Sequence, residues 1–515
     1  MSKVMVPAPR RRPFGELGLA KTVQAVVNEI AELYKADSIP WVIGYSGGKD
    51  STATLQLVWT ALQKLPASAL TKPVHVISTD TLVENPIVSA WVNRSLDVMG
   101  TRAAELGLPL TPHKLTPELA DTFWVNLIGK GYPAPRPRFR WCTERLKIKP
   151  SNTFIRSMVR AHGEAILVLG MRKQESATRS RVMTAHEAYR VRERLAPNAS
   201  LPNSLVYTPV ETWSSDEVWM YLMQVDNPWG YSNRDLLTMY QGASEDNECP
   251  LVVDTSTPSC GDSRFGCWTC TLVDQDKSMT AMVLNDADKA WMEPLLTLRN
   301  ELDLQDDRQL RDFRRMNGSV QLFNDEPRPI HGPYTQPSRQ RWLRRLLEAQ
   351  EEVRRTGPPE VAQIDLITLA ELEEIRRIWV VEKHEFEDTL PRIYAEATGR
   401  PYPGKPLDEA LPLGAVEVEL LAEICGDDRL QFETVRELLD VERRHRNQVR
   451  RAGLFTALEN ALAKGFYRDQ DDAVDYARRQ KATREAFNAD DLASGNLQLI
   501  LDAGAGDTSA FDDIS

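Results

Sequence analysis

The sequence of 515 residues has no long apolar run. No stretch approaches the roughly 18 consecutive apolar residues of a membrane-spanning helix, so we expect no membrane partner. Three arginines stand at positions 10–12, but no apolar segment follows them, and they therefore do not begin a secretory signal. These absences lead us to expect a cytoplasmic protein.

A net positive charge is also missing. The formal net charge of −11 argues against a protein that coats DNA without regard to sequence. Residues 130–194 depart from this balance, with 16 Lys+Arg against 5 Asp+Glu, so they carry +11 and the rest of the chain −22. One basic segment in an acidic chain favours a confined anionic substrate, and it is compatible with a DNA backbone presented locally.

Cysteine is scarce, with six in the chain, but four of them lie within 22 residues. In a cytosolic chain such clustering argues for metal rather than for disulfides. The set suits either zinc or an iron–sulfur cluster, and its spacing does not choose between them. Its members are Cys249, Cys260, Cys267 and Cys270. We expect Cys425 to be an ordinary buried cysteine in a helix over residues 416–425.

The best-defined motif is SGGKDS at residues 46–51. It follows a short apolar run and precedes apolar residues at helical spacing, so the pattern predicts a strand, a glycine turn and a helix. Such a turn directs backbone N–H groups and a helix N-terminus at one point, which favours a bound anion. Gly47 and Gly48 allow phosphate to approach closely, and Lys49 adds a mobile positive charge. The motif is not a Walker A loop, because Asp50 follows the lysine where that loop has Ser or Thr.

Further strands are predicted at residues 74–78, 108–115, 165–170 and 206–210, alternating with helices. This alternation predicts an α/β fold with a doubly wound, mostly parallel sheet. Ligands of such sheets bind at the carboxyl ends of the strands, where the SGGKDS loop, Asp80 and Arg172 all fall. Asp80 has two interpretations, a place near ATP and its magnesium ion or a cap for the helix that follows.

Two basic stretches contain further candidates. Residues 133–150 (PAPRPRFRWCTERLKIKP) surround Cys142 with arginine, a residue suited to bidentate phosphate contacts. Neighbouring positive charge should lower the pKa of this thiol, which suits a cysteine that carries sulfur. Residues 170–181 (GMRKQESATRSR) contain Arg172 and Arg179.

SGGKDS resembles the signature of the PP-loop ATP pyrophosphatases, which split ATP into AMP and pyrophosphate. Residues 38–275 resemble the PAPS-reductase-like branch of that family. The resemblance rests on four motifs in a fixed order, SGGKDS, RWCT, GMRKQESATR and PVETWSSDEVW. The cysteine set, ending in FGCWTCT at residues 265–271, resembles the DndC family of DNA phosphorothioation proteins. That family is understood as an iron–sulfur ATP pyrophosphatase that replaces a non-bridging phosphate oxygen of DNA by sulfur.

The resemblance implies ATP, Mg2+ and a cluster, [4Fe-4S] with zinc as the lesser alternative. It implies a cysteine desulfurase as sulfur donor, other DNA phosphorothioation proteins as partners, and DNA as the substrate. The implied ATP-binding residues are Ser46, Gly47, Gly48, Lys49, Asp50, Ser51, Asp80, Arg172 and Arg179. The implied catalytic residues are Lys49, Asp50, Cys142 and Arg172. The implied cluster ligands are Cys249, Cys260, Cys267 and Cys270, with Cys142 as a possible substitute.

Three other functions stay open. A PAPS or APS reductase would carry an E-C-G-x-H motif near its C-terminus, but residues 423–427 read EICGD and lack the histidine. A tRNA thiolase would share the loop and a cysteine-held cluster. A nucleotide-binding scaffold with structural zinc would share both motifs without catalysis.

The expected organisation has five parts. A helical arm (1–37) precedes the PP-loop domain (38–240), the cysteine-rich cluster segment (241–280), a helical C-terminal region (281–500) and a disordered acidic tail (501–515). In the helical region we expect charged helices over residues 339–355, 368–386 and 430–462. That region is expected to pack and to bind partners rather than to carry chemistry.

Overall fold

The computed structural model describes residues 13–175, 183, 194–198, 200–243, 265–323, 328–407, 411–448 and 450–493. Arg179, Cys249, Cys260 and the predicted acidic tail lie outside these residues. The chain forms two compact units. The α/β unit comprises Met1–Pro117, Arg145–Cys270 and Gln275–Leu296, and the helical unit comprises Glu118–Glu144, Thr271–Asp274 and Thr297–Ser515.

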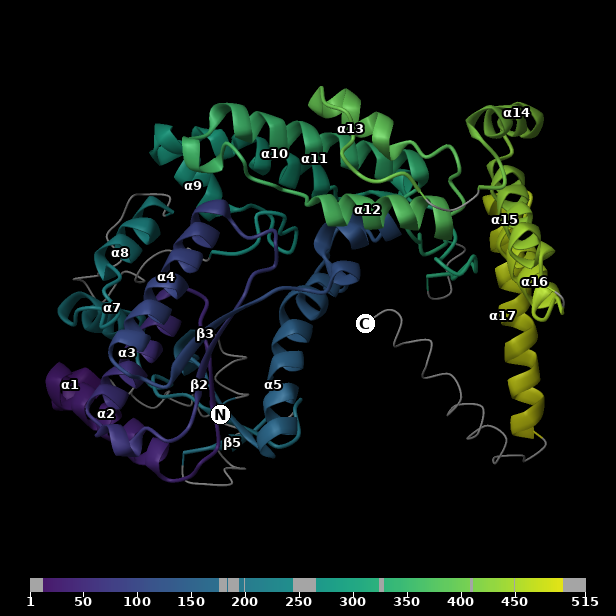
Figure 1. Cartoon of the computed structure of the whole chain (residues 1–515). Helices are drawn as coiled ribbons and strands as arrows, with labels where there is room; N and C mark the ends of the chain where they lie inside the picture. The colour runs from purple at the N-terminus through teal and green to yellow at the C-terminus, as the bar shows by residue number, and fades with distance from the viewer. Residues whose placement is uncertain are drawn as a thin grey trace, which may run out of the picture. The chain divides into compact units, whose positions relative to one another are not determined.

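The helices and strands are labelled as in Figure 1. The first part of the chain contains α1 (Pro13–Leu17), α2 (Leu19–Lys35), β1 (Trp41–Gly44), α3 (Lys49–Gln63), β2 (Val74–Thr79), α4 (Pro86–Glu105), β3 (Leu110–Leu115), α5 (Lys149–His162), β4 (Ala165–Val168), β5 (Ala196–Pro197) and β6 (Ser204–Tyr207). It continues with α7 (Ser215–Gln224), α8 (Asn233–Gly242), α9 (Lys277–Asn285) and α10 (Glu293–Leu302). The remaining helices are α11 (Gln336–Thr356), α12 (Leu369–Arg377), α13 (Leu390–Thr398), α14 (Ala415–Cys425), α15 (Arg429–Arg446), α16 (Leu454–Gly465) and α17 (Gln470–Ala493).

The α/β unit is built on a six-stranded sheet with the order β3-β2-β1-β4-β6-β5. Every pairing is parallel except that of β5 with β6. The chain builds β2 and β3 to one side of β1 and then returns to place β4 on its other side. The predicted doubly wound, mostly parallel α/β fold is therefore confirmed, and the strand order reverses between β1 and β4.

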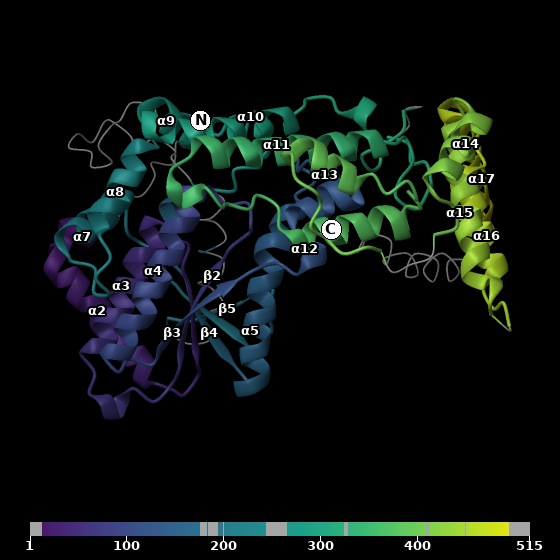
Figure 2. The same cartoon turned by 45° about the horizontal axis from the view of Figure 1, so that its top comes forward.

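Alternate residues of the strands face two hydrophobic layers. Trp41 and Ile43 of β1 lie in the larger core, which includes apolar residues of α2, α3 and α4. Val42, between them, lies in a smaller core with Ile155 of α5. Figure 2 shows α3 and α4 on one face of the sheet and α5 on the other. Burial on both faces explains why these strands read as continuous apolar runs.

Helix α7 begins with a capping box. Ser214 accepts a hydrogen bond from the backbone N–H of Glu217 (3.2 Å), and the Glu217 carboxylate accepts one from the N–H of Ser214 (2.8 Å). Glu217 is buried and also accepts a hydrogen bond from the N–H of Phe14 (2.9 Å). The cap therefore fixes α7 and also ties α1 to it.

The helical unit contains a segment from the first half of the sequence. Residues 118–144, which separate β3 from α5, group with it rather than with the sheet. The indole N–H of Trp124 donates to the carbonyl of Leu366 (2.8 Å), and that of Trp379 donates to the carbonyl of Ile128 (2.9 Å). Buried indole groups with distant backbone partners hold this segment in place. The predicted PP-loop domain (38–240) includes residues 118–144, whereas these residues group with the helical unit. The predicted domain boundaries themselves stay a prediction.

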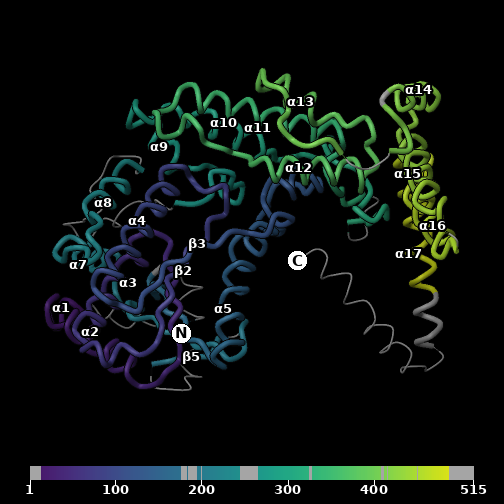
Figure 3. The backbone as a smooth tube through the Cα atoms, viewed as in Figure 1, coloured from purple at the N-terminus to yellow at the C-terminus, as the bar shows by residue number. Residues whose placement is uncertain are grey.

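Two of the predicted long helices are shorter than expected. The expected helix over residues 430–462 is two helices, α15 and α16, and Gly453 before α16 has φ +80°. The expected helix over residues 368–386 ends in a π-helical turn, Ile378–Glu382, before His384 at φ +58°. A helix cannot continue through a residue with left-handed backbone angles, so neither expected helix can run unbroken through Gly453 or His384. Figure 3 shows α15, α16 and α17 side by side.

The predicted helix around Cys425 is confirmed as α14, and Cys425 is buried. Among the described helices, none combines the length and the apolar character that a bilayer span requires.

A histidine pair on the α5 face of the sheet gives a testable pH dependence. His75 Nδ1 and His113 Nε2 lie 3.0 Å apart, and burial lowers the pKa of both, with His113 and His162 lowering that of His75 further. The folded state therefore binds fewer protons than the unfolded chain, and stability should fall as the pH drops below about 6.5.

In urea unfolding followed by tryptophan fluorescence, His113→Gln should lose less stability than the wild type between pH 7.5 and pH 5.5. His445→Gln in α15 is the matched control and should follow the wild type. Equal losses in the wild type and His113→Gln would contradict this account.

Candidate active site

The SGGKDS loop joins β1 to α3 at the carboxyl edge of the sheet, as predicted. The backbone N–H of Ser46 donates to Ser51 Oγ (3.2 Å), and Ser51 Oγ donates to the carbonyl of Gly48 (3.0 Å). Gly47 has φ +72°, and a Cβ at this position would lie 2.5 Å from Val92 Cγ2. The hydrogen bonds of Ser46 and Ser51 thus hold the two ends of the loop together. Position 47 requires glycine, because its φ is positive and because a Cβ would clash with Val92.

A second glycine brings the end of β4 against this loop. A Cβ on Gly170 would lie 2.6 Å from the carbonyl oxygen of Asp50 and 2.9 Å from the backbone nitrogen of Ser51. The segment after β4 therefore touches the first turn of α3 backbone to backbone. This contact lies where the strand order reverses, the usual ligand position in such sheets.

We predict that Gly170→Ala destabilises the α/β unit, because neither backbone segment can move away without disturbing the loop. The expected loss is about 1–3 kcal/mol in urea unfolding. Gly242→Ala in α8 is the matched control, since the nearest atom to its Cβ position is the flexible end of Lys289 at 3.8 Å. A Gly170→Ala variant as stable as Gly242→Ala would contradict the prediction.

Arg172 contacts Asp50 of the motif. Its Nε lies 2.7 Å from Asp50 Oδ1 and its Nη2 lies 3.4 Å from Oδ2, while Nη1 donates to the carbonyl of Trp213 (3.4 Å). Arg172 is buried. A guanidinium held at three points is a fixed positive charge beside the start of α3. The structure therefore brings two predicted site residues together, with the arginine also fixing the aspartate.

Lys49, the first residue of α3, lies against an aromatic side chain that sequence reasoning missed. Its Nζ lies 5.3 Å from the ring centroid of Tyr240 in α8, and its backbone N–H donates to the Tyr240 hydroxyl (3.4 Å). Its Nζ also lies 3.7 Å from Asp50 Oδ2. Lys49, Asp50 and Arg172 thus form a compact group of alternating charge.

Asp80 follows β2 but does not cap α4. Its Oδ1 accepts a hydrogen bond from the backbone N–H of Leu82 (2.8 Å), and its Oδ2 lies 2.8 Å from Lys114 Nζ. The cap of α4 is Asn85, which accepts from the N–H of Ile87 (3.0 Å). The helix-cap interpretation of Asp80 is therefore wrong. Its carboxylate shapes a turn in which Leu82 has φ +64°, and its role near ATP stays a prediction.

The turn with Cys267 and Cys270 lies against the loop after β2. The N–H of Trp268 donates to the carbonyl of Val83 (2.9 Å), and the N–H of Cys270 donates to the carbonyl of Cys267 (3.0 Å). Both cysteines are partly exposed. Two cysteines of the predicted cluster are therefore presented from a single turn on the α/β unit, beside the segment that follows β2.

Polar groups surround the Cys267 sulfur. Thr81 Oγ1 lies 3.3 Å from Sγ, and Glu84 Oε1 lies 3.8 Å from Sγ and 3.6 Å from Lys147 Nζ. Burial, followed by the Glu84 carboxylate, raises the pKa of Cys267 to about 12. The protonated thiol is thus the stable form without metal, and metal binding would displace its proton.

The described half of the predicted ligand set fits a metal centre, since it offers two cysteines in one turn with a hydroxyl beside one of them. Cys249 and Cys260 lie outside the described residues, as does Arg179. Among the described residues, no group of three or more His, Cys, Asp or Glu is placed to hold a metal.

Cys142 belongs to the helical unit and is partly exposed. The preceding Trp141 is buried, stacks on Phe123 with centroids 5.3 Å apart, and donates its indole N–H to the carbonyl of Pro133 (3.0 Å). The N–H of Thr143 donates to the carbonyl of Arg140 (3.0 Å), so Cys142 lies inside a tight turn. The structure thus holds the backbone around this cysteine firmly, and the sulfur-carrying role stays a prediction.

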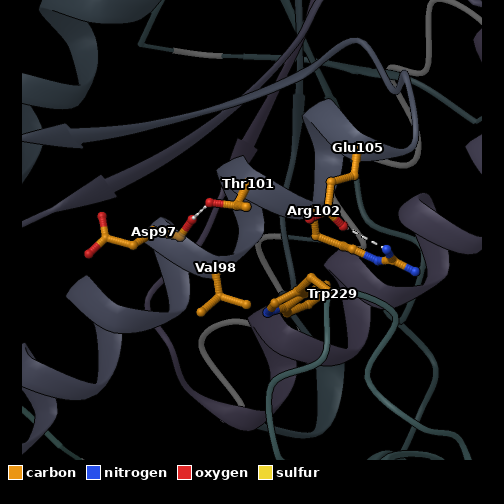
Figure 4. Close-up of a pocket in the computed structure, with 6 residues that line it drawn as sticks. All are labelled: Asp97, Val98, Thr101, Arg102, Glu105 and Trp229. Carbon is orange, nitrogen blue, oxygen red and sulfur yellow. Dashed lines mark hydrogen bonds and ion pairs between the residues drawn. The ribbon is translucent and has the colours of Figure 1, made fainter.

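A surface pocket of about 330 Å³ lies beside α4. Figure 4 shows its lining, in which Arg102 and Glu105 pair across 2.7 Å over Trp229. None of the predicted site residues lines it. The pocket is therefore not the predicted nucleotide site.

The strand order places the SGGKDS loop at the reversal point of a doubly wound, mostly parallel α/β domain. Residues 40–272, a little under half of the chain, match the family model of the phosphoadenosine phosphosulfate reductase domain. This match supports a nucleotide-utilising enzyme of the PP-loop type.

An uncharacterized protein of Methanocaldococcus jannaschii is 26% identical over 200 residues, which are 39% of this chain and 35% of that protein. The chain thus spans about a third of the length of the curated relative it matches. A phosphoadenylyl-sulfate (PAPS) reductase from Candida auris is 15% identical, with 40% of this chain and 85% of that chain covered and a TM-score of 0.24. An FMN adenylyltransferase from Candida glabrata is 13% identical, with 42% and 60% covered and a TM-score of 0.24.

Proposed function

We propose that this protein is an ATP pyrophosphatase that uses ATP to place sulfur on a phosphate of the DNA backbone. The observation that carries the ATP step is the SGGKDS loop at the reversal of the strand order, with Lys49 and the buried Arg172 beside it. The family match over residues 40–272 supports a nucleotide at this site. DNA as substrate rests on the sequence resemblance to the DndC family.

In the proposed first step, a non-bridging oxygen of a DNA phosphate attacks the α-phosphorus of ATP. The bond between the α- and β-phosphates breaks, and pyrophosphate leaves, so that AMP is attached to the DNA phosphate. Lys49 and the loop N–H groups would bind the β- and γ-phosphates, and Arg172 would hold Asp50 and add positive charge. Mg2+, when bound, would neutralise further charge on the ATP phosphates.

In the proposed second step, the terminal sulfur of a persulfide on Cys142 attacks the phosphorus of the adenylated DNA phosphate, and AMP leaves with the oxygen. The resulting phosphorus–sulfur–sulfur linkage is then cleaved by a dithiol reductant. That reduction takes two electrons, leaves the phosphorothioate on DNA and returns Cys142 as a thiol. A cysteine desulfurase would supply the persulfide sulfur.

Cys267 and Cys270 on the α/β unit, together with Cys249 and Cys260, would hold a [4Fe-4S] cluster, with zinc as the lesser alternative. When bound, such a cluster supplies electron-transfer or sulfur-binding chemistry. The chain's own contribution is to fix two ligands in one turn and to place the Thr81 hydroxyl beside one of them.

A reductase function of the PAPS or APS type is disfavoured by the surroundings of Cys425. This cysteine is buried at the end of α14 in the helical unit, and Gly426 and Asp427 follow it without a histidine. A reductase would need an exposed, activated thiol at such a position.

The substrate can be tested in cells that differ only in this gene. DNA and tRNA are digested to nucleotides and analysed by mass spectrometry in the deletion strain and after complementation with wild type or Lys49→Met. We expect phosphorothioate-linked dinucleotides in DNA with wild type alone and unchanged tRNA. Thiolated tRNA that depends on the gene, with unmodified DNA, would overturn the proposal and favour the thiolase.

A further inference from the structure

Tyr240 lies between the two predicted functional elements of the α/β unit. On one side its hydroxyl accepts the backbone N–H of Lys49 (3.4 Å) and lies 3.2 Å from the Cβ position of Gly48. On the other side its ring meets Phe265 edge to face, with centroids 4.7 Å apart at 80°. Phe265 stands two residues before Cys267. One buried side chain therefore touches both the SGGKDS loop and the segment that leads to the cysteine turn.

The surroundings of Tyr240 restrict how it can move. Trp219 of α7, which is fully buried, packs edge to face against its ring with centroids 5.1 Å apart. Tyr240 itself is 8% exposed. In a close-packed interior, a shift of one aromatic ring must be matched by its neighbours. Because Trp219 is fixed in the core, a movement of the SGGKDS loop would shift the Tyr240 ring against Phe265.

The segment after Phe265 is bound at its next residues to the loop between β2 and α4. The carbonyl of Gly266 accepts the N–H of Asn85 (3.4 Å), and the N–H of Trp268 donates to the carbonyl of Val83 (2.9 Å). A displacement of Phe265 would act on these two hydrogen bonds and on the Cys267–Cys270 turn. The contacts thus run continuously from Lys49 through Tyr240 and Phe265 to the cysteines.

We propose that Tyr240 positions Lys49 for nucleotide and couples occupancy of the SGGKDS loop to the segment with Cys267 and Cys270. This inference rests on the proposed function, because it takes ATP as the ligand of the loop. The ring holds the ammonium group within 5.3 Å, which reduces the side-chain freedom that Lys49 loses when phosphate binds. The hydroxyl contributes less, because its hydrogen bond to Lys49 is long.

The experiment measures two quantities on the full-length, anaerobically purified protein. The first is the Kd for α,β-methylene ATP, whose α–β linkage cannot be cleaved, by calorimetry. The second is the change in hydrogen–deuterium exchange of the peptide containing residues 265–270 when this analogue binds. Exchange reports on the backbone whether or not a cluster is present.

We expect Tyr240→Phe to bind within about threefold of wild type, because it keeps the ring and loses one weak hydrogen bond. Tyr240→Leu should bind about tenfold more weakly and lose the exchange response. Phe265→Leu should keep the wild-type affinity and lose the response, and this combination separates coupling from binding. Phe154→Leu, on the opposite face of the sheet, is the control and should match wild type in both quantities.

A merely structural role for Tyr240 differs from a positioning role in one measurable way. If Tyr240 positions Lys49, the effect of Tyr240→Leu on the Kd depends on the presence of Lys49. In a Lys49→Met background, Tyr240→Leu should cause no further loss of affinity. The inference is overturned if Tyr240→Leu weakens binding equally in both backgrounds, or if Phe265→Leu responds like wild type. A wild-type protein that does not bind the analogue would instead overturn the proposed function itself.

Discussion

Replacing Lys49 by methionine is expected to lower the rate of pyrophosphate release from ATP by about two to three orders of magnitude. Its ammonium group stands at the N-terminus of α3, in the motif that we assign to the β- and γ-phosphates. Pyrophosphate gains negative charge as it leaves, and methionine has a similar length without the charge that stabilises it. The rate is measured by coupling released pyrophosphate to a colorimetric pyrophosphatase assay.

The matched control is Lys64→Met at the other end of α3, where Nζ donates to Gln24 on the surface (3.0 Å). Both variants remove one lysine, Lys49 from the start of α3 and Lys64 from its C-cap, so only the position differs. Thermal unfolding should show that both variants keep the fold, because methionine is close to lysine in length and keeps an apolar stem at each position. If Lys49→Met retains a rate like that of Lys64→Met, the loop does not bind the phosphates as we propose.

Replacing Cys267 by alanine is expected to remove most of the bound iron and the broad visible absorbance of the anaerobically purified protein. The proposed cluster draws two ligands from the turn at Cys267, and the Thr81 hydroxyl lies 3.3 Å from that sulfur. A three-cysteine remnant binds a four-iron cluster less firmly, because each missing thiolate leaves one iron without its ligand. Iron, zinc and acid-labile sulfide are counted per chain beside the absorption spectrum.

Cys425→Ala is the control for this measurement, since that cysteine is buried in α14 of the helical unit. It should keep the iron content and the colour of the wild type. If the wild type and Cys425→Ala both contain zinc instead of iron, the cysteines form a structural zinc site and not an iron–sulfur cluster. Iron that persists in Cys267→Ala would exclude Cys267 as a ligand.

The sequence predicts the fold of the SGGKDS loop and its flanking elements well, because their structure is local. Strand, glycine turn and helix follow one another within residues 41–63, and periodicity and glycine placement suffice to predict them. The mostly parallel, doubly wound sheet also follows from the α/β alternation, whereas the order of its strands does not. The same local logic predicts the capping box at Ser214, because its two partners are three residues apart.

Contacts between residues far apart in the sequence cannot be predicted from local sequence patterns. Tyr240 stands 191 residues after Lys49, and nothing in its local sequence distinguishes it from an ordinary buried tyrosine of α8. Arg172 is predicted beside the loop, but its pairing with Asp50 depends on tertiary packing across 122 residues. The grouping of residues 118–144 with the helical unit rests on indole hydrogen bonds spanning more than 200 residues.

The most direct test of the central claim is the identity of the products that the purified protein makes from ATP labelled in the α-phosphate. We predict label in AMP, attached to the oligonucleotide without a sulfur donor and released when the sulfur donor is present, with an equal amount of pyrophosphate, in a reaction that requires Lys49 and an oligonucleotide acceptor. Labelled ADP with orthophosphate would contradict the account, because it would show cleavage between the β- and γ-phosphates.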